Sequence, residues 1–275
     1  MSTMQNSRPL SGSVAFVTGG SKGIGRAIAI GLARAGASVA LTGRTPGTEP
    51  GTAAATAALI TSEGGRALPL ICDVRDEDSV RRCIDGATRD LGGLHVLVNN
   101  AGLYFPGHTL DAIDVDQWDE TLATHLRGTF LCSRHAIPHL KAAGGGSIIN
   151  LSSTAGDSSY DATGNIAYAV AKAGIEQITR GLALELAPHD IAVNAIRPMS
   201  LLSEGSRRSL AGSDQLKTFV EPSAICPAIV HLAQQRAGFS GNILRRTDFQ
   251  SGTFHEAVAI GRNTDLHSFV RSNAR

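Results

Sequence analysis

Short apolar runs alternate along the chain with longer stretches in which apolar residues recur at helical spacing. The runs predict strands at Val14–Thr18, Ser38–Thr42, Ala67–Cys72, Val96–Asn99, Ser147–Leu151, Ile191–Ile196 and, more weakly, Asn242–Arg245. The longer stretches predict helices at Ile24–Ala35, Thr52–Glu63, Asp76–Leu91, Asp116–Ala142 and Ala167–Ala187. Strands that lack polar alternation are typical of burial on both faces. We therefore predict an α/β fold, a doubly wound parallel sheet (Rossmann-type) of about seven strands with helices on both faces.

No proline-rich linker or break in composition divides the chain, which predicts one domain over residues 1–275. Residues 1–13 are expected to form an N-terminal extension and residues 251–275 a C-terminal tail. The helical pattern weakens over residues 199–222, where apolar side chains mix with basic ones. We expect this segment to be a mobile loop or short helices, and to contact the substrate.

Composition narrows the classes of partner. Lys and Arg total 25 against 24 Asp and Glu, so there is no basic footprint for nucleic acid and no polybasic membrane patch. The four cysteines share no metal-ligand spacing, which predicts no metal site and indicates thiols of a reducing compartment. Residues 1–13 are polar and do not resemble a signal segment. We therefore expect a cytoplasmic protein that acts on a small molecule.

A glycine-rich turn follows the first strand and opens the first helix, with the sequence Thr18-Gly19-Gly20-Ser21-Lys22-Gly23-Ile24-Gly25. Glycines at such a turn let the backbone approach a pyrophosphate, and the start of the helix supplies oriented N–H groups. The alternative is a turn with only a structural purpose. Its position at the first strand of a doubly wound pattern favours dinucleotide binding.

The end of the second strand bears on which dinucleotide is bound. NAD sites place an acidic residue there, whereas this chain reads Leu41-Thr42-Gly43-Arg44. The Arg44 guanidinium can bind a 2′-phosphate, and Lys22 can add a second cation. The alternative is that both are ordinary surface cations. We predict that NADP(H) is preferred and that NAD(H) is possible.

Further motifs occur in an order that resembles the short-chain dehydrogenase/reductase family from about Gly12 to Phe249. They are Cys72-Asp73-Val74, Asn99-Asn100-Ala101-Gly102, Ser152-Ser153, Tyr168-Ala169-Val170-Ala171-Lys172 and Asn194-Ala195-Ile196-Arg197-Pro198. The chain is most similar to the NADP(H)-preferring type typified by 3-oxoacyl-acyl-carrier-protein reductases. The resemblance implies a cofactor site made of Gly19, Ser21, Lys22, Gly23, Ile24, Gly25, Arg44, Asp73, Val74, Asn100, Ala101, Gly102, Tyr168, Lys172, Pro198 and Ser203. It also implies a homotetramer, or a homodimer.

The expected reaction is hydride transfer between NADP(H) and a carbonyl or secondary alcohol. Tyr168 and Lys172 are four residues apart, so a helix places them on one face. A free phenol has a pKa near 10, and an ammonium beside it is expected to lower that pKa toward neutrality. Tyr168 is then the general acid or base, and Ser153 is expected to donate to the substrate oxygen. The resemblance gives Lys172 a second contact, with the nicotinamide ribose.

The chain departs from the family at three places. His125 stands where the family has a catalytic asparagine, and it either sustains a proton relay to Lys172 or only fills space. Met199 replaces the glycine after Pro198, and Ser203 stands where a threonine contacts the nicotinamide. The end of the chain also lacks the family's usual closing motif, which leaves the pairing of the last strand open. The alternative function is therefore a dinucleotide-binding protein with weak or no catalysis.

Overall fold

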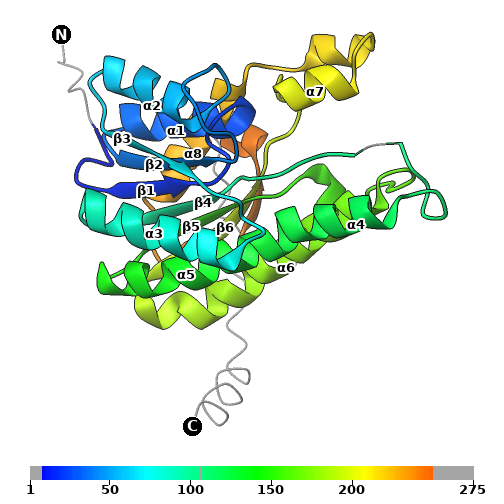
Figure 1. Cartoon of the computed structure of the whole chain (residues 1–275). Helices are drawn as coiled ribbons and strands as arrows, with labels where there is room; N and C mark the ends of the chain where they lie inside the picture. Colours follow the sequence, from blue (N-terminus) through cyan, green and yellow to red (C-terminus); the bar gives the residue numbers. More distant parts are fainter. Residues whose placement is uncertain (1–7, 106, 250–275) are drawn as a thin grey trace, which may run out of the picture.

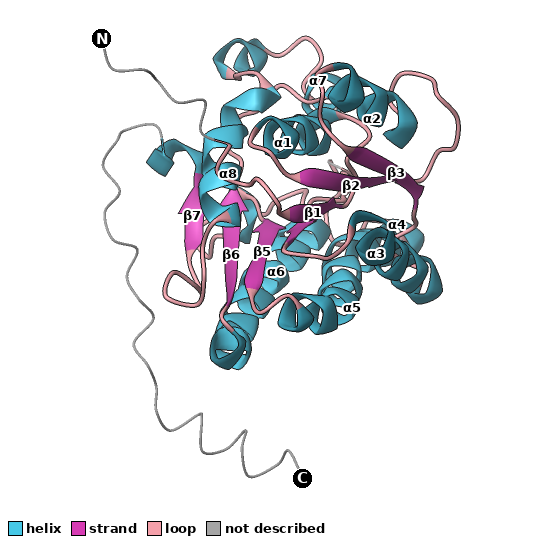
Figure 2. Cartoon of the chain, turned by 90° about the vertical axis from the view of Figure 1, so that its left-hand side faces the viewer, coloured by secondary structure: helices cyan, strands magenta, loops and turns pink. Residues whose placement is uncertain are grey.

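The computed structural model describes residues 8–105 and 107–249 of the 275-residue chain. Its centre is a sheet of seven parallel strands in the order β3-β2-β1-β4-β5-β6-β7. Helices cover both faces of the sheet (Figures 1 and 2). The predicted doubly wound α/β fold is therefore confirmed. The predicted extension falls partly, and the predicted tail wholly, outside the described residues.

The strands are β1 (Val14–Val17), β2 (Ser38–Gly43), β3 (Ala67–Ile71), β4 (Val96–Asn99), β5 (Gly146–Leu151), β6 (Ile191–Arg197) and β7 (Ile243–Arg245). The α-helices are α1 (Gly23–Arg34), α2 (Ala53–Ser62), α3 (Glu77–Leu91), α4 (Val115–Leu122), α5 (Gly128–Ala142), α6 (Ile166–Leu186), α7 (Glu204–Ser209) and α8 (Cys226–Ala233). None of the helices in the described part of the chain has the length and apolarity that a membrane span needs.

The core is divided into two layers by the sheet. Ala15 and Val17 of β1 point into a cluster with α1, α2 and α8, whereas Val14 and Phe16 point into a cluster with α3, α5 and α6. Successive side chains of a strand alternate between faces, and both faces are covered here. This explains why the strands are continuous apolar runs.

Side-chain caps begin several helices. The Thr52 hydroxyl accepts a hydrogen bond from the Ala55 N–H at the start of α2, and the Asp76 carboxylate accepts from the first turn of α3. Helix α3 ends at Gly92, whose φ of 91° lies in the left-handed region that favours glycine. These caps fix the predicted boundaries to within a residue or two.

One element differs from the sequence-based boundaries, and two weaker predictions are confirmed. The predicted helix 116–142 is α4, a π-helical turn at Ala123–Arg127 and then α5. The weakly predicted last strand is present as β7 and pairs in parallel with β6. Segment 199–222 contains the short α7 and a 3₁₀ turn at Asp214–Thr218.

The sheet order creates a crevice. The chain leaves β1 toward β2 and β3 on one side, then returns to build β4 to β7 on the other. Loops that leave β1 and β4 in opposite directions open a gap beyond the carboxyl ends of the strands, where doubly wound folds bind ligands. Most of the predicted site motifs follow the ends of strands that meet at this edge, whereas Tyr168 and Lys172 lie in the first turns of α6.

Candidate active site

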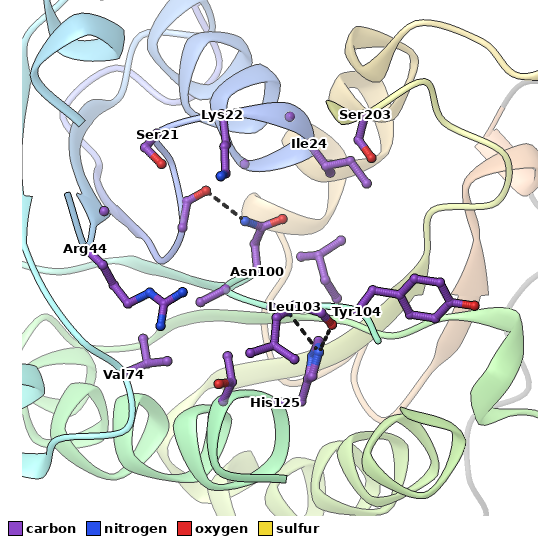
Figure 3. Close-up of a pocket in the computed structure, with 18 of the residues that line it drawn as sticks. Ser21, Lys22, Ile24, Arg44, Val74, Asn100, Leu103, Tyr104, His125 and Ser203 are labelled. Carbon is purple, nitrogen blue, oxygen red and sulfur yellow. Dashed lines mark hydrogen bonds between the residues drawn. The ribbon is translucent and has the colours of Figure 1, made fainter. Parts of the chain in front are cut away.

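A cleft of about 590 Å³ lies at the carboxyl edge of the sheet. The structure brings into its walls every predicted site residue except Ser153: Gly19, Ser21, Lys22, Gly23, Ile24, Gly25, Arg44, Asp73, Val74, Asn100, Ala101, Gly102, His125, Tyr168, Lys172, Pro198 and Ser203. Figure 3 shows Arg44 at one end of the cleft and Tyr104 with His125 at the other. Sequence reasoning did not select Tyr104, Thr42 or Glu204, which also line it.

The glycine turn has a backbone that other residues cannot adopt. A Cβ at Gly25 would lie 2.1 Å from the Gly19 carbonyl oxygen, and Gly19 has a φ of +65°. No side chain caps the start of α1, so its first N–H groups face the cleft. A cradle with these N–H groups and no Cβ atoms fits a pyrophosphate.

Asn100 and Thr18 hold the turn against the loop after β4. The Asn100 side-chain N–H group donates to the carbonyl oxygens of Thr18 at 2.8 Å and Gly19 at 3.2 Å. Figure 3 shows Asn100 with one of these bonds dashed. The Thr18 hydroxyl oxygen accepts from the backbone N–H groups of Asn100 and Ala101, each at 2.9 Å. Thr18 was not singled out from the sequence, although it fixes both loops of the cleft.

The end of the cleft beside β2 and β3 carries exposed charges. The Arg75 guanidinium binds the Asp73 carboxylate at 2.6 Å and Glu120 at 2.8 Å. The hydrogen bond from Arg75 lowers the pKa of Asp73. Arg44 lies 3.8 Å from Glu120 with 56% of its side chain exposed. Lys22 is exposed as well, so both predicted cations remain accessible from solvent.

At the opposite end of the cleft, the ionisable side chains of Lys172 and His125 are buried. Lys172 is 4% exposed, and its Nζ donates to the Leu151 carbonyl oxygen at 2.7 Å. This ammonium lies 5.3 Å from the centre of the Tyr168 ring. Burial lowers the pKa of Lys172 to about 7.

The pKa of Tyr168 differs from the sequence-based expectation. Although part of the side chain is accessible, burial among its neighbours raises the pKa of Tyr168 to about 12, against a smaller lowering by a hydrogen bond with Ser153. We expected the Lys172 ammonium to lower this pKa. Desolvation outweighs that effect here, because it disfavours the charged forms of both groups.

The two candidate serines have separate environments. The Ser152 hydroxyl is buried and donates to the Glu176 carboxylate at 2.7 Å. The Ser153 hydroxyl oxygen accepts from the Ala155 N–H at 3.2 Å, which caps a 3₁₀ turn at Thr154–Gly156. Ser153 is also the serine that hydrogen-bonds with Tyr168. Of the two, Ser153 therefore has the geometry to share a substrate oxygen with Tyr168.

His125 lies in the π-helical turn and is 3% exposed. Its Nε2 lies 2.7 Å from the Leu103 carbonyl oxygen, and its ring meets the Tyr168 ring edge-on at 5.2 Å between centroids. Burial, with the nearby Lys172 charge, lowers the pKa of His125 to about 3. The ring is therefore neutral. Its Nε2 lies between the carbonyl oxygen of Leu103 and the backbone N–H of the same residue, the latter at 3.2 Å, so the tautomer decides which of the two it bonds. Within the described residues Nδ1 has no hydrogen-bond partner.

Segment 199–222 closes over the cleft beside the glycine turn. Met199 has a φ of +60°, so it adopts the left-handed conformation that the family gives to glycine. The Ser203 hydroxyl accepts from the Ser206 N–H at 3.0 Å. The Glu204 carboxylate lies 3.4 Å from Arg26 and would be 3.0 Å from a Cβ at Gly23. A carboxylate therefore stands beside the turn that fits a pyrophosphate.

The chain is similar to one well-defined family of proteins. Residues 13–212 match the family model described as short chain dehydrogenase. The chain belongs to the short-chain dehydrogenase/reductase family, whose members are NAD(P)-dependent enzymes acting on CH–OH groups.

Individual relatives are similar over most of this chain. Cis-4-hydroxycyclohexanecarboxylate dehydrogenase of Sinomonas cyclohexanicum is 36% identical over 233 residues, 82% of this chain and 91% of the relative. Hydroxysteroid dehydrogenase-like protein 2 of Danio rerio is 34% identical over 248 residues, 88% of this chain, which spans only 58% of that relative.

Solved structures match as well. A short-chain alcohol dehydrogenase described as putative, from Sinorhizobium meliloti 1021, has a TM-score of 0.76 and 34% identity, covering 88% of this chain and 98% of its own. A short-chain dehydrogenase/reductase from Serratia marcescens BCRC 10948 has a TM-score of 0.77 and 33% identity, covering 86% and 97%.

Proposed function

We propose that this enzyme interconverts a carbonyl compound and a secondary alcohol with NADP(H), and that Tyr168 transfers the proton. The observation that carries the proposal is the half-buried Tyr168 beside Ser153 and Lys172 at one end of a cleft whose other end is a glycine cradle. The cofactor, when bound, supplies or accepts the hydride. Gly19, Gly23 and Gly25 would hold its pyrophosphate, and Asp73 and Val74 would lie beside its adenine.

Tyr168 is suited to donate a proton in the reductive direction. With its pKa raised to about 12, the phenol is protonated throughout the neutral range. Ser153 hydrogen-bonds the substrate oxygen and orients it toward the phenol. Lys172 holds its position through Leu151 and is available to the cofactor ribose.

His125 contributes to the site as a neutral acceptor. In the tautomer with the proton on Nε2, its Nδ1 can accept a hydrogen bond from a water molecule, while its Nε2 holds the Leu103 loop. A relay through His125 thus needs no change of its charge near neutral pH. Loss of turnover in His125→Ala with retained turnover in His125→Asn supports this role, whereas unchanged turnover in His125→Ala refutes it.

The preference for NADP(H) is supported by the end of β2. Arg44 is exposed, only loosely paired with Glu120, and accompanied by Lys22 on the far side of the cleft. Michaelis constants for NADPH and NADH with one carbonyl substrate test the preference. A lower constant for NADH would overturn it and leave NAD(H) as the cofactor.

Two observations narrow the substrate class: aromatic side chains line one end of the cleft, and two of the similar proteins have names that refer to cyclic substrates. The Tyr104 ring stands edge-on to Tyr168 at 5.1 Å between centroids, and Phe105 lines the same wall. We propose an alicyclic ketone or alcohol as substrate, in line with the printed names of the relatives.

A panel tests this with NADPH oxidation as the readout. It contains 4-oxocyclohexanecarboxylate, a 3-oxosteroid, a 3-oxoacyl thioester, an aldehyde and a quinone. The cyclic ketones are expected to be reduced fastest. Fastest reduction of the thioester would instead favour the resemblance to acyl-carrier-protein reductases, and reduction of none would favour a dinucleotide-binding protein without efficient catalysis.

We further propose a homotetramer, or a homodimer, that uses the outer faces of α5 and α6. A groove of about 440 Å³ lies there, lined by Phe130, Ile137, Ile178 and Leu182 with Arg134 and Glu185 at its edge. Phe130 is 47% exposed in the single chain. Light scattering on Phe130→Glu is expected to show smaller particles than the wild type; equal mass would contradict this interface.

The remaining expectations concern the chain as a whole. We propose that residues 1–275 belong to one domain and that the protein is cytoplasmic, because its four cysteines are unpaired in the structure. Cell fractionation checks the location, and a single cooperative unfolding transition checks the domain.

A further inference from the structure

A buried ion pair lies directly behind the proposed catalytic residues. Glu176 follows Lys172 by one turn of α6, and Arg197 is the last residue of β6. The Arg197 guanidinium donates to both carboxylate oxygens of Glu176, at 2.8 and 2.9 Å. Their side chains are 11% and 3% exposed. Two further charges reach the pair: Arg180 lies 3.9 Å from Glu176, and Asp157 forms an ion pair with Arg197.

The pair contacts the turn after β5 on both sides of Ser153. Before Ser153, the Ser152 hydroxyl donates to Glu176 at 2.7 Å. After it, Gly156 packs so closely that a Cβ would lie 2.9 Å from the Glu176 Oε1. The Asp157 carboxylate then accepts a hydrogen bond from the Arg197 Nη1. Ser153 is thus held between contacts made by the same two charges.

The Asp157 contact is not needed to neutralise Arg197. Glu176 already supplies a two-bond carboxylate partner, and a buried ion pair by itself adds little stability over apolar packing. The Asp157 carboxylate instead connects the loop after Ser153 to Arg197 at the end of β6. That strand continues directly into Pro198 on the cleft wall.

We propose that Glu176, Arg197 and Asp157 form a positioning clamp that sets Ser153 against Tyr168. The inference rests on the proposed function, because it assumes that Ser153 and Tyr168 share the substrate oxygen. None of the three clamp residues needs to touch the substrate. They act through Ser153, because the Glu176 and Arg197 contacts on either side of it fix where the turn places its hydroxyl.

Asp157→Asn is the least disruptive test, since the Asp157 side chain is 32% exposed. Asp161→Asn is a matched control. Asp157 accepts from the N–H and hydroxyl of Ser159, Asp161 accepts in the same way from Thr163, and only Asp157 binds an arginine. With the carbonyl that the panel shows to be reduced fastest, we expect Asp157→Asn to lower kcat about tenfold. The KM for NADPH should stay within about twofold of the wild-type value, and Asp161→Asn should resemble the wild type.

A double-mutant cycle separates positioning from general stability. If the clamp acts through Ser153, Asp157→Asn has no further effect on kcat in a Ser153→Ala background. Glu176→Gln, which keeps the shape of the side chain, should lower kcat as Asp157→Asn does and also leave the KM for NADPH within about twofold of the wild-type value.

The outcomes of these experiments distinguish the positioning clamp from the proposed function. Equal tenfold losses from Asp157→Asn in both backgrounds, or losses equal to those of Asp161→Asn, overturn the clamp while leaving the proposed function intact. Full turnover in Ser153→Ala overturns the role of Ser153 itself, and with it the proposed function of that residue.

Discussion

The two ends of the cleft handle charge in opposite ways. At the end near β2 and β3, Arg44 is 56% exposed and Arg75 is 33% exposed, each within reach of Glu120. At the other end, Lys172 and His125 are 4% and 3% exposed, and both have lowered pKa values. Exposed charges are screened by water and salt, whereas buried ones are governed by desolvation. Changes at the first end should therefore alter cofactor affinity, and changes at the second should alter turnover.

The largest effect expected among the neighbours of Tyr168 is that of Lys172→Met. The substitution removes the buried ammonium that donates to the Leu151 carbonyl oxygen. We expect kcat to fall by about 10²- to 10³-fold, with weaker NADPH binding because the ribose contact is lost as well. Steady-state kinetics and fluorescence titration with NADPH measure the two effects. A variant with normal kcat would show that the buried end of the cleft does not govern turnover.

His125 should make the folded state sensitive to acid. Its pKa is lowered to about 3 in the folded protein, so the stability it confers is complete above the unfolded pKa of about 6.5 and is lost as the pH falls toward 3. Between pH 7 and pH 5 we expect the free energy of unfolding of the wild type to fall by about 2 kcal/mol more than that of His125→Asn. Urea unfolding of both proteins at the two pH values measures this. Equal losses would contradict a buried neutral imidazole.

Arg44→Ala tests the exposed end. We expect the KM for NADPH to rise about tenfold with kcat unchanged and the KM for NADH unaffected, because a charge-assisted hydrogen bond to a phosphate is lost. Arg81→Ala is the matched control, since Arg81 is also about half exposed and pairs with Asp78 in α3. A tenfold rise for NADH as well would mean that Arg44 does not recognise the 2′-phosphate.

The smallest effect is expected at Glu204. Its carboxylate lies beside Gly23, so it opposes an anion at the turn, but it is 42% exposed and screened. Glu204→Gln should lower the Kd for NADPH by about twofold to threefold. Glu221→Gln, in the same segment and 71% exposed, is the control. Weaker NADPH binding in Glu204→Gln would show that Glu204 assists the cofactor.

The strands and most helices could be predicted because burial on both faces of the sheet leaves a continuous apolar pattern. The division of the predicted helix 116–142 could not, since a π-helical turn of five residues is too short to show a periodicity of its own. The packing of Gly102 could not be predicted either. A Cβ there would lie 2.4 Å from the His125 ring, and this contact joins two segments that are separate in the sequence.

The cleft residues were predictable from motifs that follow strand ends, but their environments were not. Lys172 was expected to lower the pKa of Tyr168, and burial raises it instead. Tyr104 and Glu204 left no signal in the sequence, because their contacts with Tyr168 and Arg26 join residues far apart along the chain. Desolvation and long-range pairing are properties of the folded chain.

The most direct test of the account is Tyr168→Phe, measured for both kcat and NADPH affinity. The phenylalanine keeps the ring that packs against His125 and Tyr104 and removes only the hydroxyl. We predict that kcat falls by about 10²- to 10⁴-fold while the Kd for NADPH changes less than about twofold. A variant that keeps wild-type turnover, or one that loses turnover only because NADPH no longer binds, would contradict Tyr168 as the proton donor.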